Sequence, residues 1–253
     1  MLLGAVTYDI CKNWDLETLI GKLEQAGFEA VELRTTHKHG VEPSLDQAER
    51  KKVQARFERS KVRLLSYGST AEFHSPDPAV RARNVADAKM FIDLAHDTGA
   101  WGVKVRPNGL PKEVPPEKTI AGIGAALREL GDYGAGKGVE IWMEVHGRDT
   151  QNPPVAAAIM KAAHHDNVGV CWNSNPTDIV NGSVKQSFDL LRPHIKNVHI
   201  NELADSSYPW RELFTLLRQM KYERYMLCEC QESKEPERFL RWYRALWKEL
   251  ASA

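Results

Sequence analysis

The sequence lacks an excess of charge of either sign, because 34 Lys and Arg residues balance 34 Asp and Glu residues. A balanced chain has no bulk electrostatic attraction to nucleic acid or to an acidic membrane surface, so we expect neither as a partner. No apolar stretch approaches the ~18 residues of a membrane span. The N-terminal segment MLLGAVTYDICKNWD has no basic region before its short apolar run, so it does not predict a secretory signal peptide.

Cysteine is also scarce, and the four cysteines form neither a C-x-x-C pair nor a zinc-ribbon spacing. We therefore expect reduced, buried thiols and a cytoplasmic protein. The chain of 253 residues is 42% hydrophobic, so it can bury a sizeable core without disulfides. It has no linker, internal repeat or low-complexity tract, and we expect residues 1–253 to form a single domain.

Short apolar runs alternate with longer polar segments in which apolar residues recur at helical spacing, most clearly over 15–26, 77–98 and 209–220. The runs predicted as strands are 2–7, 30–33, 62–67, 102–106, 139–144, 168–172, 195–200 and 225–229. Eight strand–helix units in 253 residues predict an α/β fold, the (β/α)8 TIM barrel. A doubly wound open sheet is the alternative, but the first run is not followed by the glycine-rich phosphate loop expected there.

The active site of such a barrel lies at the carboxyl ends of its strands, and these ends are polar in nearly every predicted strand. The polar residues at or just beyond them are Tyr8, Asp9, Glu32, Arg34, His37, His39, Tyr67, Ser69, His74, Lys104, Arg106, Glu144, His146, Asn173, His199, Asn201, Glu202, Glu229 and Gln231. Because burying unpaired carboxylates is costly, a convergent group of them needs a cation or a ligand to offset the cost.

Strands five to eight end in two carboxylates, an amide and an imidazole, namely Glu144, Asn173, His199 and Glu229. Their tips lie on adjacent strands, and strand alternation turns His199 toward the barrel axis. Mostly oxygen ligands with one nitrogen suit Mn²⁺ or Mg²⁺, and Co²⁺ or Zn²⁺ less exclusively. We predict a divalent metal site at these four residues; the alternative for His199 is a hydrogen-bonded core histidine.

The whole chain resembles the xylose-isomerase-like TIM barrels, which include sugar isomerases, ketose 3-epimerases, inosose dehydratases and, more distantly, endonuclease IV. The segments that carry the resemblance are VELR (31–34), IWMEVHG (141–147), VGVCWNSNP (168–176), VHINE (198–202) and LCE (227–229). The resemblance implies that Glu144, Asn173, His199 and Glu229 hold one divalent metal. It also implies that Glu144 and Glu229 are the catalytic acid/base pair.

The sequence departs from the family after strand six, where Asp-x-x-His is common and Asn173 and Pro176 stand instead. We therefore expect a site that binds its metal more weakly than a site with an Asp would. Alternatively, the site has lost the metal, and Asn173 forms a hydrogen bond with a sugar hydroxyl. For contacts to substrate oxygens or a phosphate, we predict His74, Lys104, Arg106, His146, Asn201 and Glu202. For the basic residues among them, ion pairing around the barrel rim is the alternative.

These features predict a metal-dependent isomerase, epimerase or related dehydratase that acts on a sugar, sugar phosphate or cyclitol by proton transfer next to a carbonyl. The alternative is a non-catalytic carbohydrate-binding barrel with a degenerate metal site. Endonuclease action is disfavoured, because the chain is neutral and the Asp-x-His expected between His199 and Trp210 is absent. We expect a small, sugar-like partner, and the sequence leaves open whether the chain forms a homo-oligomer.

Overall fold

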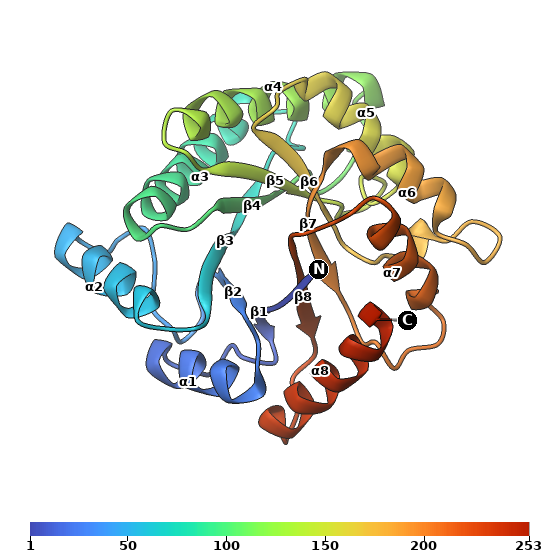
Figure 1. Ribbon diagram of the computed structural model, residues 1–253. Helices are drawn as coiled ribbons and strands as arrows, with labels where there is room; N and C mark the ends of the chain where they lie inside the picture. The colour runs from blue at the N-terminus through green and yellow to red at the C-terminus, as the bar shows by residue number, and fades with distance from the viewer. Residues whose placement is uncertain (253) are drawn as a thin grey trace.

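The apolar runs form the strands of a closed parallel barrel in the computed structural model, which describes residues 1–252 (Figure 1). Each strand pairs with the next along the chain, and the last closes on the first. The strands are β1 (Leu2–Asp9), β2 (Ala30–Arg34), β3 (Arg63–Glu72), β4 (Gly102–Arg106), β5 (Glu140–Glu144), β6 (Val168–Trp172), β7 (Ile195–Ile200) and β8 (Tyr225–Cys230). The predicted (β/α)8 barrel is confirmed.

A helix follows each strand and packs on the outside of the barrel (Figure 1). The helices are α1 (Leu16–Ala26), α2 (Gln47–Glu58), α3 (Pro78–Thr98), α4 (Pro116–Ala135), α5 (Pro153–Ala163), α6 (Lys185–Leu191), α7 (Trp210–Gln219) and α8 (Pro236–Ser252). Short 3-10 turns at 176–178 and 192–194 flank α6. No helix within residues 1–252 is both long and apolar enough to cross a membrane.

The helix ends lie where capping residues stand in the sequence. The Asp15 carboxylate accepts a hydrogen bond from the Thr18 backbone N–H at the start of α1, and Asp77 caps α3 in the same way. Gly27 and Gly99 end these two helices in the left-handed conformation, with φ of 74° and 78°. A residue without a Cβ adopts this conformation at little cost, which explains the two sharp stops.

Side chains alternate along each strand between the barrel interior and the layer of helices. The barrel interior below the mouth is filled by a small apolar group that includes Trp142, Cys171 and Leu227. The outward side chains join the helices in the main core. Two positions further along the chain from these three residues stand Glu144, Asn173 and Glu229, and alternation turns them toward the axis near the mouth.

Two strands extend at least two residues beyond the ends of their predicted apolar runs. β1 extends to Asp9, which pairs with Cys230, and β3 extends to Glu72, which pairs with Arg106. Both pairings resume after a register shift in the ladder. A hydrophobicity pattern does not predict these strand ends, because their residues are polar, although their backbones pair with the neighbouring strands.

Candidate active site

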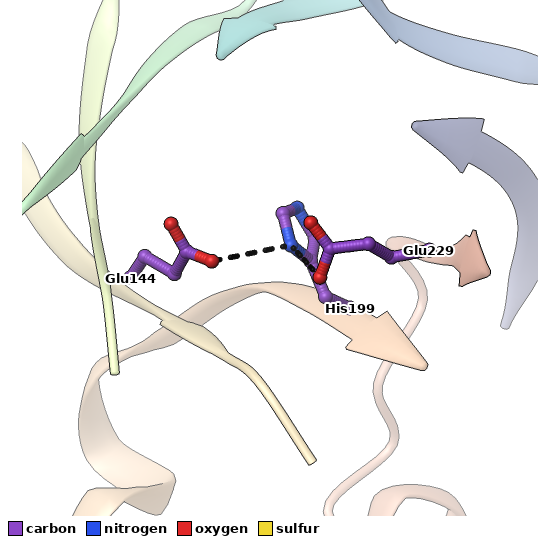
Figure 2. A group of neighbouring side chains, drawn as sticks. All are labelled: Glu144, His199 and Glu229. Atoms are coloured by element: carbon purple, nitrogen blue, oxygen red, sulfur yellow. Dashed lines mark ion pairs between the residues drawn. The ribbon is translucent and has the colours of Figure 1, made fainter. Parts of the chain in front are cut away.

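Three of the four predicted metal ligands converge at the mouth of the barrel. Glu144 on β5, His199 on β7 and Glu229 on β8 each offer a ligand atom, and these atoms all lie within 4.8 Å of one another. Figure 2 shows both carboxylates turned toward the imidazole. His199 Nδ1 lies 3.3 Å from Glu229 Oε2 and 3.9 Å from Glu144 Oε1. One ion could therefore contact all three side chains.

Asn173, the fourth predicted ligand, lies next to this group. It follows β6 directly, and the pairing of Trp172 with Val198 brings it beside His199. Its side chain is buried, and the amide oxygen Oδ1 has no hydrogen-bond partner. A buried amide oxygen without a donor carries an energetic cost of the order of 1–3 kcal/mol, which a cation or a substrate hydroxyl would remove.

The donor set fits a divalent cation. Both ring nitrogens of His199 are also buried without a hydrogen-bond partner. Two carboxylates, one imidazole nitrogen and one amide oxygen form a mixed, oxygen-rich set of the kind that Mn²⁺ and its neighbours accept. The residues present therefore fit a metal ion, although the donor set does not select among Mn²⁺, Mg²⁺, Co²⁺ and Zn²⁺.

Lys104 lies in the interior and forms an ion pair with one of these ligands. Its ammonium is 2.7 Å from Glu144 Oε2, and both side chains are only 4% exposed. Burial opposes both charges, but each partner offsets this, so the pKa of Lys104 is raised and that of Glu144 is lowered. Lys104 thus holds one oxygen of Glu144 and leaves Oε1 on the side of His199.

Glu32 on β2 also contacts His199; the sequence placed it among the polar strand ends but not among the predicted metal ligands or substrate contacts. It is fully buried, and its Oε1 lies 3.5 Å from His199 Nε2 while Oε2 accepts a hydrogen bond from Ser66 Oγ. Gly68 provides the room, because a Cβ at that position would come within 2.9 Å of Glu32 Oε1. A carboxylate behind a ligating histidine typically fixes the ring and its tautomer. Inward alternation along AVELR is the sequence signal that points to Glu32.

The charges of this cluster favour a cation. Burial works against a charged imidazole, but Cys171 and the carboxylates of Glu229 and Glu32 hold the pKa of His199 well above its usual range. A proton on His199 then supplies positive charge among the carboxylates. A metal ion that binds there must displace it, because only the neutral ring is a ligand.

Four other residues predicted to contact substrate interact with neighbouring residues near the ends of the strands. Arg106 pairs with Glu72 at 2.6 Å, and His74 Nδ1 lies 3.9 Å from the same carboxylate. His146 Nδ1 is 2.8 Å from Asn108 Oδ1, and Asn201 donates to the carbonyl that follows Asn173, at Ser174. Their roles as substrate contacts stay predictions.

Glu202 lies elsewhere. It lines a cavity of about 730 Å³ between the segment after β7 and helix α8, together with Leu203, Trp242 and Leu246. Glu202 is three positions after His199, so strand alternation would already turn it away from the axis, and β7 itself ends at Ile200. The structure brings Glu202 to this outer cavity and not to the group formed by Glu144, His199 and Glu229.

Solved structures of similar fold cover nearly the whole chain. A D-psicose 3-epimerase with D-tagatose from Clostridium cellulolyticum H10 has a TM-score of 0.84, with 14% identity and 99% of both chains covered. An L-ribulose 3-epimerase has a TM-score of 0.84 and 18% identity, with 100% of this chain and 95% of that chain covered. The IOLI protein with a bound zinc atom has a TM-score of 0.82 and 16% identity, with 100% and 98% covered. At these identities the likeness concerns the fold.

No functionally curated protein matches the chain at significant similarity. The family described as "Xylose isomerase-like TIM barrel" does match, over residues 20–249. This match spans all but the first strand and the ends of the chain, and it includes every residue of the cluster. The chain belongs to the xylose isomerase-like TIM barrel family.

Proposed function

We propose that the protein is a divalent-metal-dependent isomerase or epimerase that moves a proton next to a carbonyl of a sugar, sugar phosphate or cyclitol. The observation that carries this proposal is the convergence of Glu144, His199 and Glu229 beside the unpartnered amide oxygen of Asn173. Similar folds described as sugar 3-epimerases support the same class of reaction.

A bound divalent ion would supply Lewis-acid polarisation of the substrate carbonyl, which makes the proton on the neighbouring carbon more acidic. Glu144, Asn173, His199 and Glu229 are the residues that would hold it. Glu32 orients the imidazole through Nε2, so that Nδ1 faces the two carboxylates. Lys104 restrains Glu144 through Oε2.

The two glutamates differ in their freedom to exchange protons. Glu144 is fixed by Lys104, whereas Glu229 has no Lys or Arg partner within 4.0 Å among residues 1–252 and is 16% exposed. We assign Glu229 as the carboxylate that removes a proton from the carbon next to the carbonyl and later releases it to solvent. Glu144 delivers a proton taken from solvent through the oxygen that faces His199. Delivery to the opposite face of the same carbon gives epimerisation. Delivery to the former carbonyl carbon, with a hydroxyl proton moving between the two oxygens, gives isomerisation.

The test is exchange of substrate hydrogen for deuterium. The protein is incubated in D₂O with Mn²⁺ and a panel of D-fructose, D-tagatose, their 6-phosphates and an inosose, and the C–H signals next to the carbonyl are followed by NMR. We expect loss of signal for at least one compound, abolished by EDTA and by Glu229→Gln. Exchange that persists with EDTA would contradict the metal-dependent mechanism.

A carbohydrate-binding barrel without turnover is the second candidate, and the neutral Asn173 is the observation that favours it. It predicts sugar binding by calorimetry without deuterium exchange for any compound of the panel. The first candidate predicts both.

A further inference from the structure

Arg34 ends β2 at the mouth of the barrel, on the inward face. It is two residues beyond Glu32, and Gly68 lies beside it in the β2–β3 ladder. A Cβ built on Gly68 would point at both Glu32 Oε1 and Arg34 Cβ, so the Glu32 and Arg34 side chains leave the strand on the same side. Two residues of strand correspond to roughly 7 Å along its axis. Since Glu32 contacts His199, the Arg34 side chain leaves the strand on the same side but roughly 7 Å closer to the mouth than Glu32 does.

Neighbours hold the Arg34 guanidinium in place without neutralising it. Its carbon lies 5.0 Å from the centre of the Tyr8 ring, and Nη1 lies 3.4 Å from His37 Nε2. The other nitrogen of His37 is 2.9 Å from Thr7 Oγ1, which also accepts a hydrogen bond from the backbone N–H of Arg34. Burial, and then the charge of Arg34, lower the pKa of His37 to about 4, so the neutral ring can accept a hydrogen bond from the guanidinium.

No carboxylate balances this charge. Within residues 1–252, no Asp or Glu oxygen lies within 4.0 Å of the Arg34 guanidinium nitrogens, whereas both cations of β4 are paired, Lys104 with Glu144 and Arg106 with Glu72. A positioned, partly buried guanidinium without a carboxylate keeps the paired donors that match a planar carboxylate or a phosphate.

We propose that Arg34 binds an anionic group of the substrate, a carboxylate or a phosphate, while the sugar oxygens lie at the metal cluster. The proposal rests on the function proposed above and narrows its substrate to acidic or phosphorylated sugars. Tyr8 and His37 set the direction of the guanidinium fork, and Glu32 ties the same strand to His199.

The experiment compares three ligands with one carbon framework: D-fructose, D-fructose 6-phosphate and D-fructuronate. Binding of each is measured by calorimetry to the wild type, Arg34→Gln and Arg34→Lys, with Mn²⁺ and with EDTA. The matched control is Arg59→Gln, at the far end of α2, where the guanidinium bonds only to the carbonyl of Ala55 in its own helix.

We expect at least one of the two acids to bind the wild type about 10–100-fold more tightly than D-fructose, as a charge-assisted hydrogen-bonded pair supplies. Arg34→Gln should abolish this preference, Arg34→Lys should keep part of it, and Arg59→Gln should leave it unchanged. The phosphate and carboxylate arms identify which anion is preferred.

Equal or absent binding of all three ligands by the wild type would overturn the proposal, as would a preference for the acid that survives in Arg34→Gln. The two failures are separable. Mn²⁺ binding and deuterium exchange without any preference for acids would remove the role of Arg34 and leave the proposed function intact. If the protein does not bind Mn²⁺ but still prefers the acids in EDTA, and Arg34→Gln abolishes that preference, the role of Arg34 stands and the metal-dependent function is contradicted.

Discussion

Replacing Asn173 by Asp adds one negative charge to the cluster and keeps the size of the side chain. The amide is buried beside His199 with its oxygen unpartnered, so the new carboxylate would face the same group of ligands. A unit charge about 4 Å from another contributes ~1 kcal/mol in water and ~4 kcal/mol at an effective dielectric of 20. A divalent ion doubles the attraction, while desolvation of the buried carboxylate offsets part of it.

We expect Asn173→Asp to bind Mn²⁺ at least ~10-fold more tightly than the wild type, which corresponds to about 1.4 kcal/mol. The metal-free variant should be less stable, because a further carboxylate joins Glu32, Glu144 and Glu229 with no additional cation. Its melting temperature should fall in EDTA and recover with Mn²⁺.

The assay is calorimetric titration of Mn²⁺ into both proteins, followed by thermal melts with EDTA and with Mn²⁺. Asn181→Asp is the matched control, since it adds the same charge at an exposed turn of the segment between β6 and α6. Equal Mn²⁺ affinities in the wild type and Asn173→Asp would refute the reasoning, and Asn173 would then lie outside the coordination shell.

Three further predictions test the cluster and its surroundings. Glu144→Gln and Glu229→Gln should each lower turnover at least ~100-fold with an unchanged circular dichroism spectrum, because an amide cannot transfer the proton; retained turnover in either would remove that residue from the acid/base pair. Glu32→Gln should weaken Mn²⁺ binding about 10–100-fold, as loss of a partner behind a ligating histidine does, and unchanged affinity would show that Glu32 does not orient His199. Burial raises the pKa of Asp178 to about 7, although hydrogen bonds from Tyr208 and Asn175 act in the opposite direction. The folded state therefore binds the proton of the Asp178 carboxyl more tightly than the unfolded state does. The stability that this protonation contributes at low pH is lost as the pH rises toward 7. In denaturant unfolding, the free energy of unfolding of Asp178→Asn relative to that of the wild type should therefore be higher at pH 8 than at pH 5. An equal difference between the two proteins at both pH values would contradict the raised pKa of Asp178.

Most of the fold is readable from the sequence, because each buried parallel strand is a short apolar run between helices with clear end signals. The strand predicted at 102–106 has the observed bounds, and so do those at 168–172 and 195–200. The ends of β1 and β3 are not readable in this way. Asp9 and Glu72 remain in the ladder through backbone pairing across a register shift, which leaves no hydrophobic signal.

The candidate site is readable in part. Chain order and strand alternation were enough to bring Glu144, His199 and Glu229 together, since inward positions at the ends of neighbouring strands must meet. The partners of these residues depend on side-chain direction and register across several strands. The Lys104–Glu144 ion pair and the contact of Glu32 with His199 are of this kind, and no spacing in the sequence encodes either.

The buried charges around His199 explain why a neutral residue at position 173 is compatible with a divalent ion. Glu32, Glu144 and Glu229 bring three negative charges to the interior, and Lys104 removes one of them. A net charge of minus two remains when His199 is neutral, and a divalent ion balances it. An aspartate at position 173 would leave a negative charge uncompensated in a buried site, at a cost to the metal-free fold. Asn173 is therefore compatible with an intact metal site, because Glu32 supplies, behind His199, the carboxylate that strand six lacks.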